Sequence, residues 1–158
     1  MVDETTFTLE AAALLPALYR ICMSILHSDA DAQDAVQQCL MKGWTKRASV
    51  QQERLRPWLT RIAVNECRNI QRYRRRVYPT DTFEPPRAQE PPDMELKEAI
   101  GQMSENLRVP LLLKYRENYS EREIAEALHV PVSTVKNRLY RARHALEKSL
   151  KDVEVAFE

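Results

Sequence analysis

The chain has 158 residues, of which 44% are hydrophobic and 30% are charged, so wholesale disorder is excluded and one domain or two small ones are expected. Two glycines are very few, and long stretches of 3.6-residue hydrophobic period predict an all-α fold. No apolar run approaches the roughly 18 residues of a membrane span, and the N-terminus lacks the basic segment of a secretory signal. We therefore expect a cytoplasmic protein with no membrane insertion.

The net charge of +1 conceals four segments of different charge. Residues 1–41 carry a net charge of −5, residues 42–76 carry +9, residues 77–106 carry −5 and residues 107–158 carry +2. A segment as basic as 42–76 indicates a surface that could meet a polyanion.

The three cysteines predict buried, reduced thiols rather than a disulfide framework. Cys22, Cys39 and Cys67 are odd in number, lie far apart and occupy apolar helical positions. No pair among them and the histidines has metal-ligand spacing. We expect no metal and no other cofactor.

Two amphipathic helices are predicted first. The apolar positions of the first are Leu14, Leu15, Leu18, Ile21, Cys22, Ile25 and Leu26. The second covers residues 29–44, DADAQDAVQQCLMKGW, and Ser28 or Asp29 can cap it. Its predicted inward stripe is Ala32, Ala35, Val36, Cys39, Leu40 and Trp44, and its outward face carries Asp31, Asp34, Gln37, Gln38 and Met41. Because the helix dipole favours acids in the first turns, composition alone gives Asp31 and Asp34 a plain structural role.

A third helix is predicted over residues 54–76, after a loop at 45–53, with Pro57 tolerated in its first turn. The residues expected to pack inward are Leu55, Trp58, Leu59, Ile62, Cys67, Ile70 and Tyr73. The opposite side carries Arg61, Asn65, Arg68, Asn69, Arg72 and Arg76. Amides and guanidinium groups at this spacing suit phosphates and exposed bases. A solvated face is the alternative, but residues 61–75 hold five arginines and a single acid, which would repel one another without a partner.

Residues 77–94 contain five of the nine prolines and predict an extended, acidic linker. It separates a unit at 1–76 from a smaller one at 95–152, which a short tail at 153–158 follows. The second unit is expected to begin with a helix from about Met94 to Met103. Another helix should start near Ser104, where Pro110 would cause a kink or a lost hydrogen bond. The chain after Leu150 is expected to fray.

Residues 120–143, SEREIAEALHVPVSTVKNRLYRAR, predict a helix-turn-helix. Ser120 and Glu123 form a capping box, Pro131 breaks the first helix, and Ser133 or a neighbour caps the second. The apolar stripe of the second helix is Val135, Leu139, Ala142 and Leu146. Its other side carries Thr134, Lys136, Asn137, Arg138, Arg141 and Arg143. An ordinary helical hairpin is the alternative, but residues 133–151 hold six basic groups and one acid, where a solvated face usually mixes signs.

With both units described, the chain resembles a σ70-family RNA polymerase sigma factor of the extracytoplasmic-function (ECF) group over nearly its whole length. DAQDAVQQCLMKGW looks like the helix that binds core polymerase, and RPWLTRIAVNECRNIQRYRRR like the helix that melts the promoter and reads the −10 element. LRVPLLLKYRENYSEREIAEALHVPVSTVKNRLYRARHAL looks like the −35-reading domain. The resemblance implies an initiation factor that binds core RNA polymerase and promoter DNA, in a group where anti-sigma partners are usual.

The resemblance also implies roles for particular residues. Docking on the polymerase clamp falls to Asp31, Asp34, Gln37 and Gln38, which overturns the plain structural role above. Single-stranded −10 DNA would contact the loop residues Lys46 to Gln51, including Arg47, with Asn65 and Asn69, while Arg68, Arg72, Arg75 and Arg76 track phosphates. The −35 major groove would face Lys136, Asn137 and Arg141, with Thr134, Arg138 and Arg143 nearer the backbone.

Two other functions stay open at this point. A stand-alone helix-turn-helix regulator would need a dimer interface or a ligand pocket, and neither is evident in the sequence. A nucleic-acid enzyme would need a nucleophile or a metal-binding carboxylate cluster, and the acids near the basic regions are sparse. We therefore expect a protein that is not an enzyme.

Overall fold

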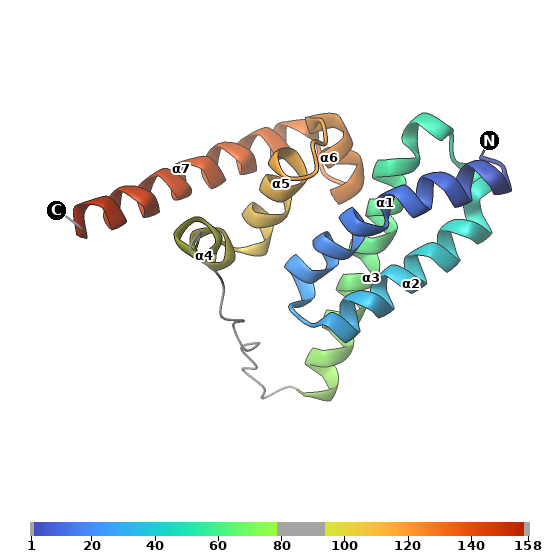
Figure 1. Ribbon diagram of the computed structural model, residues 1–158, viewed down its shortest axis with the longest axis horizontal. Coiled ribbons are helices and arrows are strands. Elements are labelled where there is room, and N and C mark those ends of the chain that lie inside the picture. Colours follow the sequence, from blue (N-terminus) through green and yellow to red (C-terminus); the bar gives the residue numbers. More distant parts are fainter. Residues whose placement is uncertain (1, 79–93, 157–158) are drawn as a thin grey trace.

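The computed structural model describes residues 2–78 and 94–156, with side chains at 2–78 and 96–149, and the predicted all-α fold is confirmed (Figure 1). The N-terminal domain contains α1 (Glu4–Leu26), α2 (Asp29–Lys46) and α3 (Leu55–Val77), with the 3-10 turns η1 (Arg47–Ser49) and η2 (Gln52–Arg54) between the last two. The C-terminal domain contains α4 (Met94–Gln102), α5 (Glu105–Tyr115), α6 (Glu121–Leu128) and α7 (Val132–Ala156). Most of the predicted linker, residues 79–93, lies outside the described residues.

The core of the N-terminal domain is packed from all three of its helices. Its fully buried side chains include Leu18, Ile21, Cys22, Ala32, Ala35, Cys39, Leu55, Leu59, Ala63 and Cys67. Helices α2 and α3 cross closely at Gly43, where an added Cβ would lie 2.6 Å from Leu59 Cδ2. Side-chain caps start two of the helices, since Asp3 accepts from Thr6 N at 2.7 Å and Ser28 accepts from Asp31 N at 3.3 Å.

The cysteines are free, buried thiols at this core, as predicted. Burial raises the pKa of Cys39 to about 12, and its thiol donates to Leu59 O at 3.2 Å. A hydrogen bond with Cys22, together with burial, raises the pKa of Cys67. Thiols held protonated in this way are poor nucleophiles, so packing is their role here.

Helix α1 corrects one expectation from the sequence. By length and composition it is the one helix among the described residues that is long and apolar enough to cross a membrane. Signal sequences and core helices of soluble proteins pass the same test. In this fold α1 buries one face against α2 and α3, with Phe7, Leu18 and Ile21 among its buried residues. The apolar residues of α1 therefore form part of the core of the domain.

Two aromatic residues that were expected inside lie at the surface. Trp44 is 39% exposed, although its ring packs edge-on against Phe7 and under the guanidinium of Arg47. Tyr73 is 56% exposed, and the buried residues of α3 end at Cys67. The prediction failed because a helical period gives a direction around the helix and does not say where along it the core ends.

The C-terminal domain places α5, α6 and α7 around Leu113, Ile124, Val135 and Leu139, and α4 packs against α7. Helix α5 continues through Pro110, which is buried. The capping box of α6 is present with both of its hydrogen bonds, each 3.1 Å long.

The last helix differs from prediction at both ends. It begins at Val132, where Pro131 O accepts from Thr134 N at 3.0 Å, so Ser133 lies in the first turn and is not the cap. It continues to Ala156, where fraying was expected after Leu150. Residues 132–158 contain neither proline nor glycine, so nothing in the sequence stops the helix.

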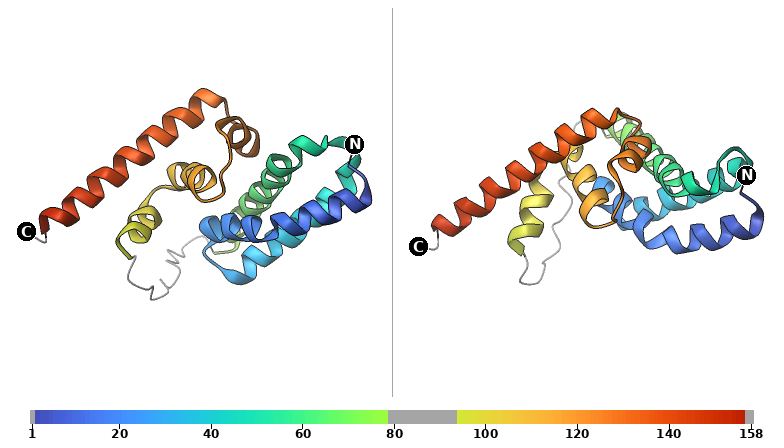
Figure 2. Two further views of the ribbon diagram at one scale, coloured as in Figure 1. Left: turned by 45° about the horizontal axis from the view of Figure 1, so that its top comes forward. Right: turned by 90° about the horizontal axis from the view of Figure 1, so that it is seen from above.

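The two domains pack against each other, and the three views of the molecule agree on this (Figures 1 and 2). Helix α3 lies along α6, and α1 lies against α5. Between the domains the buried hydroxyl groups of Thr60 and Tyr119 form a hydrogen bond of 2.6 Å. The first domain thus meets the start of the helix-turn-helix in this conformation.

Candidate nucleic-acid interface

The outward face of α2 is acidic and polar, and it divides into two parts. Asp34, Gln37 and Gln38 are exposed, and Met41, also exposed, lies one turn further on. Asp31 is different, because its side chain is only 18% exposed and forms an ion pair with Arg74 of α3. The structure thus leaves three of the four predicted polymerase-binding residues at the surface and uses the fourth to join two helices.

The cationic face of α3 is exposed as the sequence analysis expected. Its exposed members are Asn65, Arg68, Asn69, Arg72, Arg75 and Arg76. Arg72 donates to Asn69 Oδ1 at 3.2 Å and to Arg68 O at 3.4 Å, so the guanidinium lies flat along the helix. Glu66 is buried and pairs with Lys42 of α2, so the one acid of this stretch faces inward. The exposed charges of this face are therefore all cationic, and its amides and the exposed Tyr73 lie among them.

Two further residues predicted to contact DNA, at the end of α2 and in the turn that follows it, differ in exposure. Lys46 is exposed. Arg47 is half-buried, because its guanidinium stacks 4.0 Å from the Trp44 ring centroid, donates to Trp44 O at 2.7 Å and pairs with Glu4 at 3.3 Å. Its charge is already engaged within the domain.

The outer face of α7 carries the predicted −35 residues. Lys136, Asn137, Arg141 and Arg143 are exposed, while Thr134 and Arg138 are half-buried. Arg143 donates to the hydroxyl of Tyr115 at 2.8 Å, which ties the middle of α7 to the end of α5. Tyr140 stacks on His144 on the same helix, with ring centroids 6.3 Å apart.

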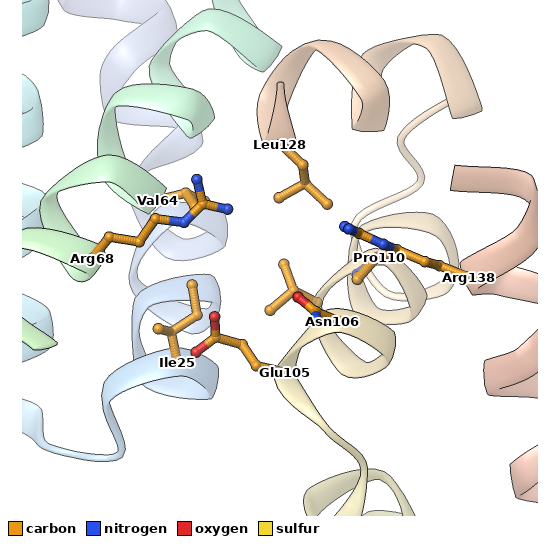
Figure 3. Close-up of a pocket in the computed structure, with 9 residues that line it drawn as sticks. Ile25, Val64, Arg68, Glu105, Asn106, Pro110, Leu128 and Arg138 are labelled. Atoms are coloured by element: carbon orange, nitrogen blue, oxygen red, sulfur yellow. The ribbon is translucent and has the colours of Figure 1, made fainter. Parts of the chain in front are cut away.

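A small pocket lies between the two domains (Figure 3). Arg68 of α3 and Arg138 of α7 point into it from opposite sides. Its remaining lining is Ile25, Val64, Glu105, Asn106, Val109, Pro110 and Leu128. Two arginines that were assigned to different promoter elements therefore lie at one pocket in this conformation.

The negative charges at the interface are carboxylates of the second domain. Burial alone would raise the pKa of Glu117, but hydrogen bonds and charge from Arg20 and Arg116 lower it overall. The same balance lowers the pKa of Glu123, where the opposing donors are Arg56 and the backbone of Ser120. Both carboxylates are therefore ionised at neutral pH and held by cations.

Sequence reasoning missed these partners across the interface. Arg20, Arg54 and Arg56 were given no role from the sequence, and Glu123 was predicted only as a cap. The opposite net charges of the sequence segments were the only signal that the domains could pair, and such charges do not predict which arginine meets which glutamate. Over the described ranges no group of three His, Cys, Asp or Glu side chains could hold a metal ion.

The geometry defines a helical DNA-binding protein of two domains, with a cationic helix on one and a helix-turn-helix on the other. Residues 11–77 match the family model for sigma-70 region 2, and residues 93–146 match the model for sigma-70 region 4. The chain belongs to the sigma-70 family, in its ECF group, and is an initiation factor that directs RNA polymerase to promoters.

Relatives of known identity cover most of the chain. It is 27% identical to the RNA polymerase sigma-H factor of Pseudomonas aeruginosa, over 94% of this chain and 88% of that protein. It is 29% identical to the ECF sigma factor SigW of Bacillus subtilis, over 86% and 84% of the two chains. The sigma factor RpoE of Bartonella quintana, solved with the anti-sigma factor NepR, is similar with a TM-score of 0.79 and 30% identity, over 92% of this chain and 96% of that one. CnrH, solved with the cytosolic domain of CnrY, gives 0.70 and 25%, over 95% and 90%.

Proposed function

We propose that the chain directs initiation through three surfaces, one on each of α2, α3 and α7. Core RNA polymerase binds the outward face of α2, at Asp34, Gln37 and Gln38, with Asp31 holding that face against α3. The −10 element, as single-stranded DNA, binds Lys46, Arg47, Asn65, Arg68, Asn69, Arg72, Arg75 and Arg76. The −35 element, as duplex, binds Thr134, Lys136, Asn137, Arg138, Arg141 and Arg143.

The observation that carries this proposal is the different chemistry of the outer faces of α2, α3 and α7. The outer residues of α3 are amides and guanidinium groups, which suit unstacked bases and phosphates. Those of α7 follow the turn of a helix-turn-helix, where a second helix enters the major groove. In domain terms, residues 1–76 bind polymerase and the −10 element, and residues 95–152 read the −35 element. Residues 77–94 link these units, and residues 153–158 follow them.

We also infer an anti-sigma partner and a cytoplasmic site of action. The support is the similarity to RpoE, solved with NepR, and to CnrH, solved with the cytosolic domain of CnrY. The chain acts as a dissociable subunit of the polymerase, without a cofactor and without chemistry of its own.

Runoff transcription with purified core RNA polymerase on genomic fragments tests the proposal. Adding the chain should produce transcripts with defined start sites, and mapping those sites should show shared sequences near −10 and −35. Core enzyme alone is the control. Absence of chain-dependent transcripts from every fragment would overturn the proposal.

The family membership does not favour a stand-alone regulator, and a band-shift separates the two functions. The chain without core enzyme should bind promoter fragments poorly, because two weak readers gain affinity only when their geometry is fixed. Tight, specific binding of the free chain to a palindrome, with no binding to core enzyme, would support the regulator instead.

A further inference from the structure

The ion pairs that join the two domains share one polarity among the described residues. The first domain supplies the cation and the second domain supplies the acid in Arg20–Glu117, Arg54–Glu126 and Arg56–Glu123. Gln71 likewise donates to Glu105 at 2.9 Å. The start of α3 thus presents guanidinium groups, and α6 presents carboxylates to them.

The geometry of two of these pairs is that of an oxyanion site. Arg56 donates from Nε to Glu123 Oε2 at 2.8 Å and from Nη2 to Oε1 at 2.5 Å, and its guanidinium lies 4.3 Å from the Tyr119 ring centroid. Arg54 donates from Nε to Glu126 Oε1 at 2.9 Å. The planar fork of a guanidinium fits phosphate as well as it fits carboxylate. The Arg54 and Arg56 side chains are 63% and 37% exposed, so their partners are exchangeable.

The packed arrangement cannot persist on a promoter. Elements centred near −10 and −35 lie about 25 base pairs apart, or about 85 Å at roughly 3.4 Å per base pair. Arg68 and Arg138 line the same pocket, so they cannot reach both elements together. When the domains separate, α6 leaves α3, and Arg54 and Arg56 lose Glu126 and Glu123.

We propose that Arg54 and Arg56 form a phosphate-binding pair for promoter DNA, and that Glu126 and Glu123 occupy this pair in the free chain in place of phosphates. The proposal rests on the proposed function, because it needs the chain to bind DNA as part of the polymerase. Residues 42–76 carry a net charge of +9, and Arg54 and Arg56 flank the start of the helix that bears the −10 residues. DNA offers a continuous row of phosphates to such a surface. A patch of polymerase carboxylates is the competing partner.

The salt dependence of promoter binding tests the pair. Holoenzyme would be formed with wild-type chain, with R54Q/R56Q, or with K97Q, which removes an exposed cation of α4. Binding to a labelled promoter duplex from the runoff experiment would be measured over a range of salt concentrations. Two lost phosphate contacts should reduce the slope of log K against log salt by about 1.4 to 1.8. K97Q should keep the wild-type slope.

Each other outcome is decisive. An unchanged slope for R54Q/R56Q would overturn the phosphate assignment. An unchanged slope together with weaker binding to core enzyme, measured without DNA, would assign the two arginines to polymerase carboxylates and would also overturn it. Thermal unfolding shows whether the double variant is folded. If it is not, the single variants R54Q and R56Q replace it, and each should show about half of the change in slope expected for the double variant. Failure of the wild-type chain to form a promoter-binding holoenzyme would instead overturn the proposed function.

Discussion

Arg56 and Glu123 lie 67 residues apart in the sequence and form a two-bonded ion pair between the domains. Glu123 Oε1 also accepts from the backbone N–H of Ser120 at 3.1 Å, which completes the capping box of α6. One carboxylate therefore fixes the start of the helix-turn-helix and its contact with the first domain. Perturbing the cap and perturbing the pair should have separable effects.

Ser120→Ala should lower the free energy of unfolding by about 0.5–2 kcal/mol, because the N–H of Glu123 loses its side-chain acceptor. Ser133→Ala is the matched control, since Ser133 is exposed in the first turn of α7 and is not its cap. It should change stability by less than about 0.5 kcal/mol. Chemical denaturation of the two variants measures both values. Equal losses would contradict the assignment of the cap.

Stability should fall as the pH falls below the ordinary range of a glutamate. The folded-state pKa values of Glu117 and Glu123 are lowered from 4.5, so the unfolded chain binds protons more readily than the folded one. The stabilisation by these groups is present above about 4.5 and is lost as the pH falls through the lowered folded values. Unfolding free energies at a series of pH values from 7 to 3 should show this decline. Glu117→Gln should make it shallower, and an identical profile for this variant would exclude Glu117 as a cause.

Gly43→Ala should destabilise the first domain by about 1–3 kcal/mol through overpacking. The new Cβ would meet Leu59 Cδ2 at 2.6 Å and Phe7 Cζ at 3.3 Å, and both side chains are buried in the core. Gly101→Ala is the matched control, because nothing lies within 4 Å of its Cβ position in α4. It should be neutral or stabilising by up to about 1 kcal/mol. Thermal unfolding compares the two, and a stable Gly43→Ala protein would show that Leu59 can move aside.

Asp34→Arg should weaken binding to core polymerase by more than about tenfold, because it reverses a charge on the proposed docking face. The fold should be unaffected, since Asp34 is exposed. Glu147→Arg makes the same charge reversal on the exposed surface of α7 and should leave binding unchanged. A pull-down with core enzyme, in the absence of DNA, measures both. Wild-type binding by Asp34→Arg would remove the docking assignment.

Arg141→Ala should cost about 1–3 kcal/mol of promoter binding at one −35 position if the guanidinium contacts a base edge. Binding would be measured by competition among promoters that differ at single −35 positions. The variant should stop discriminating at one position and retain the wild-type preferences elsewhere. A uniform loss over all promoters would mean that Arg141 contacts only phosphate.

The helices were predictable because their local signals agree with one another. Ser28 and Ser120 cap where the sequence indicated, and the hydrophobic period predicted most of the buried faces of α1, α3 and α7. Leu15 is an exception, because it was expected on the apolar side of the first helix and is 37% exposed. Local signals could not place Trp44 or Tyr73, since whether a residue meets the core depends on how far the neighbouring helices extend.

The sequence predicted most of the exposed polar side chains of the candidate site, but it did not predict which residues they contact. Asn65, Arg68 and Arg141 are exposed as expected, because an unmixed cationic face has no place in a core. The pairing of Asp31 with Arg74, and of Arg56 with Glu123, follows from tertiary packing. The sequence predicts a cap at Glu123 and a docking role for Asp31, and no spacing rule connects either residue to its arginine.

The length of α7 has a mechanical consequence. Its 25 residues form one uninterrupted helix of about 37 Å at 1.5 Å per residue, and α4 packs against it (Figure 1). Lys136 and Arg141 lie in its first half, so they share a stiff rod with its last turns. Any molecule that binds the far end of this rod and rotates it would also rotate the side chains proposed to read the −35 element, without touching the DNA.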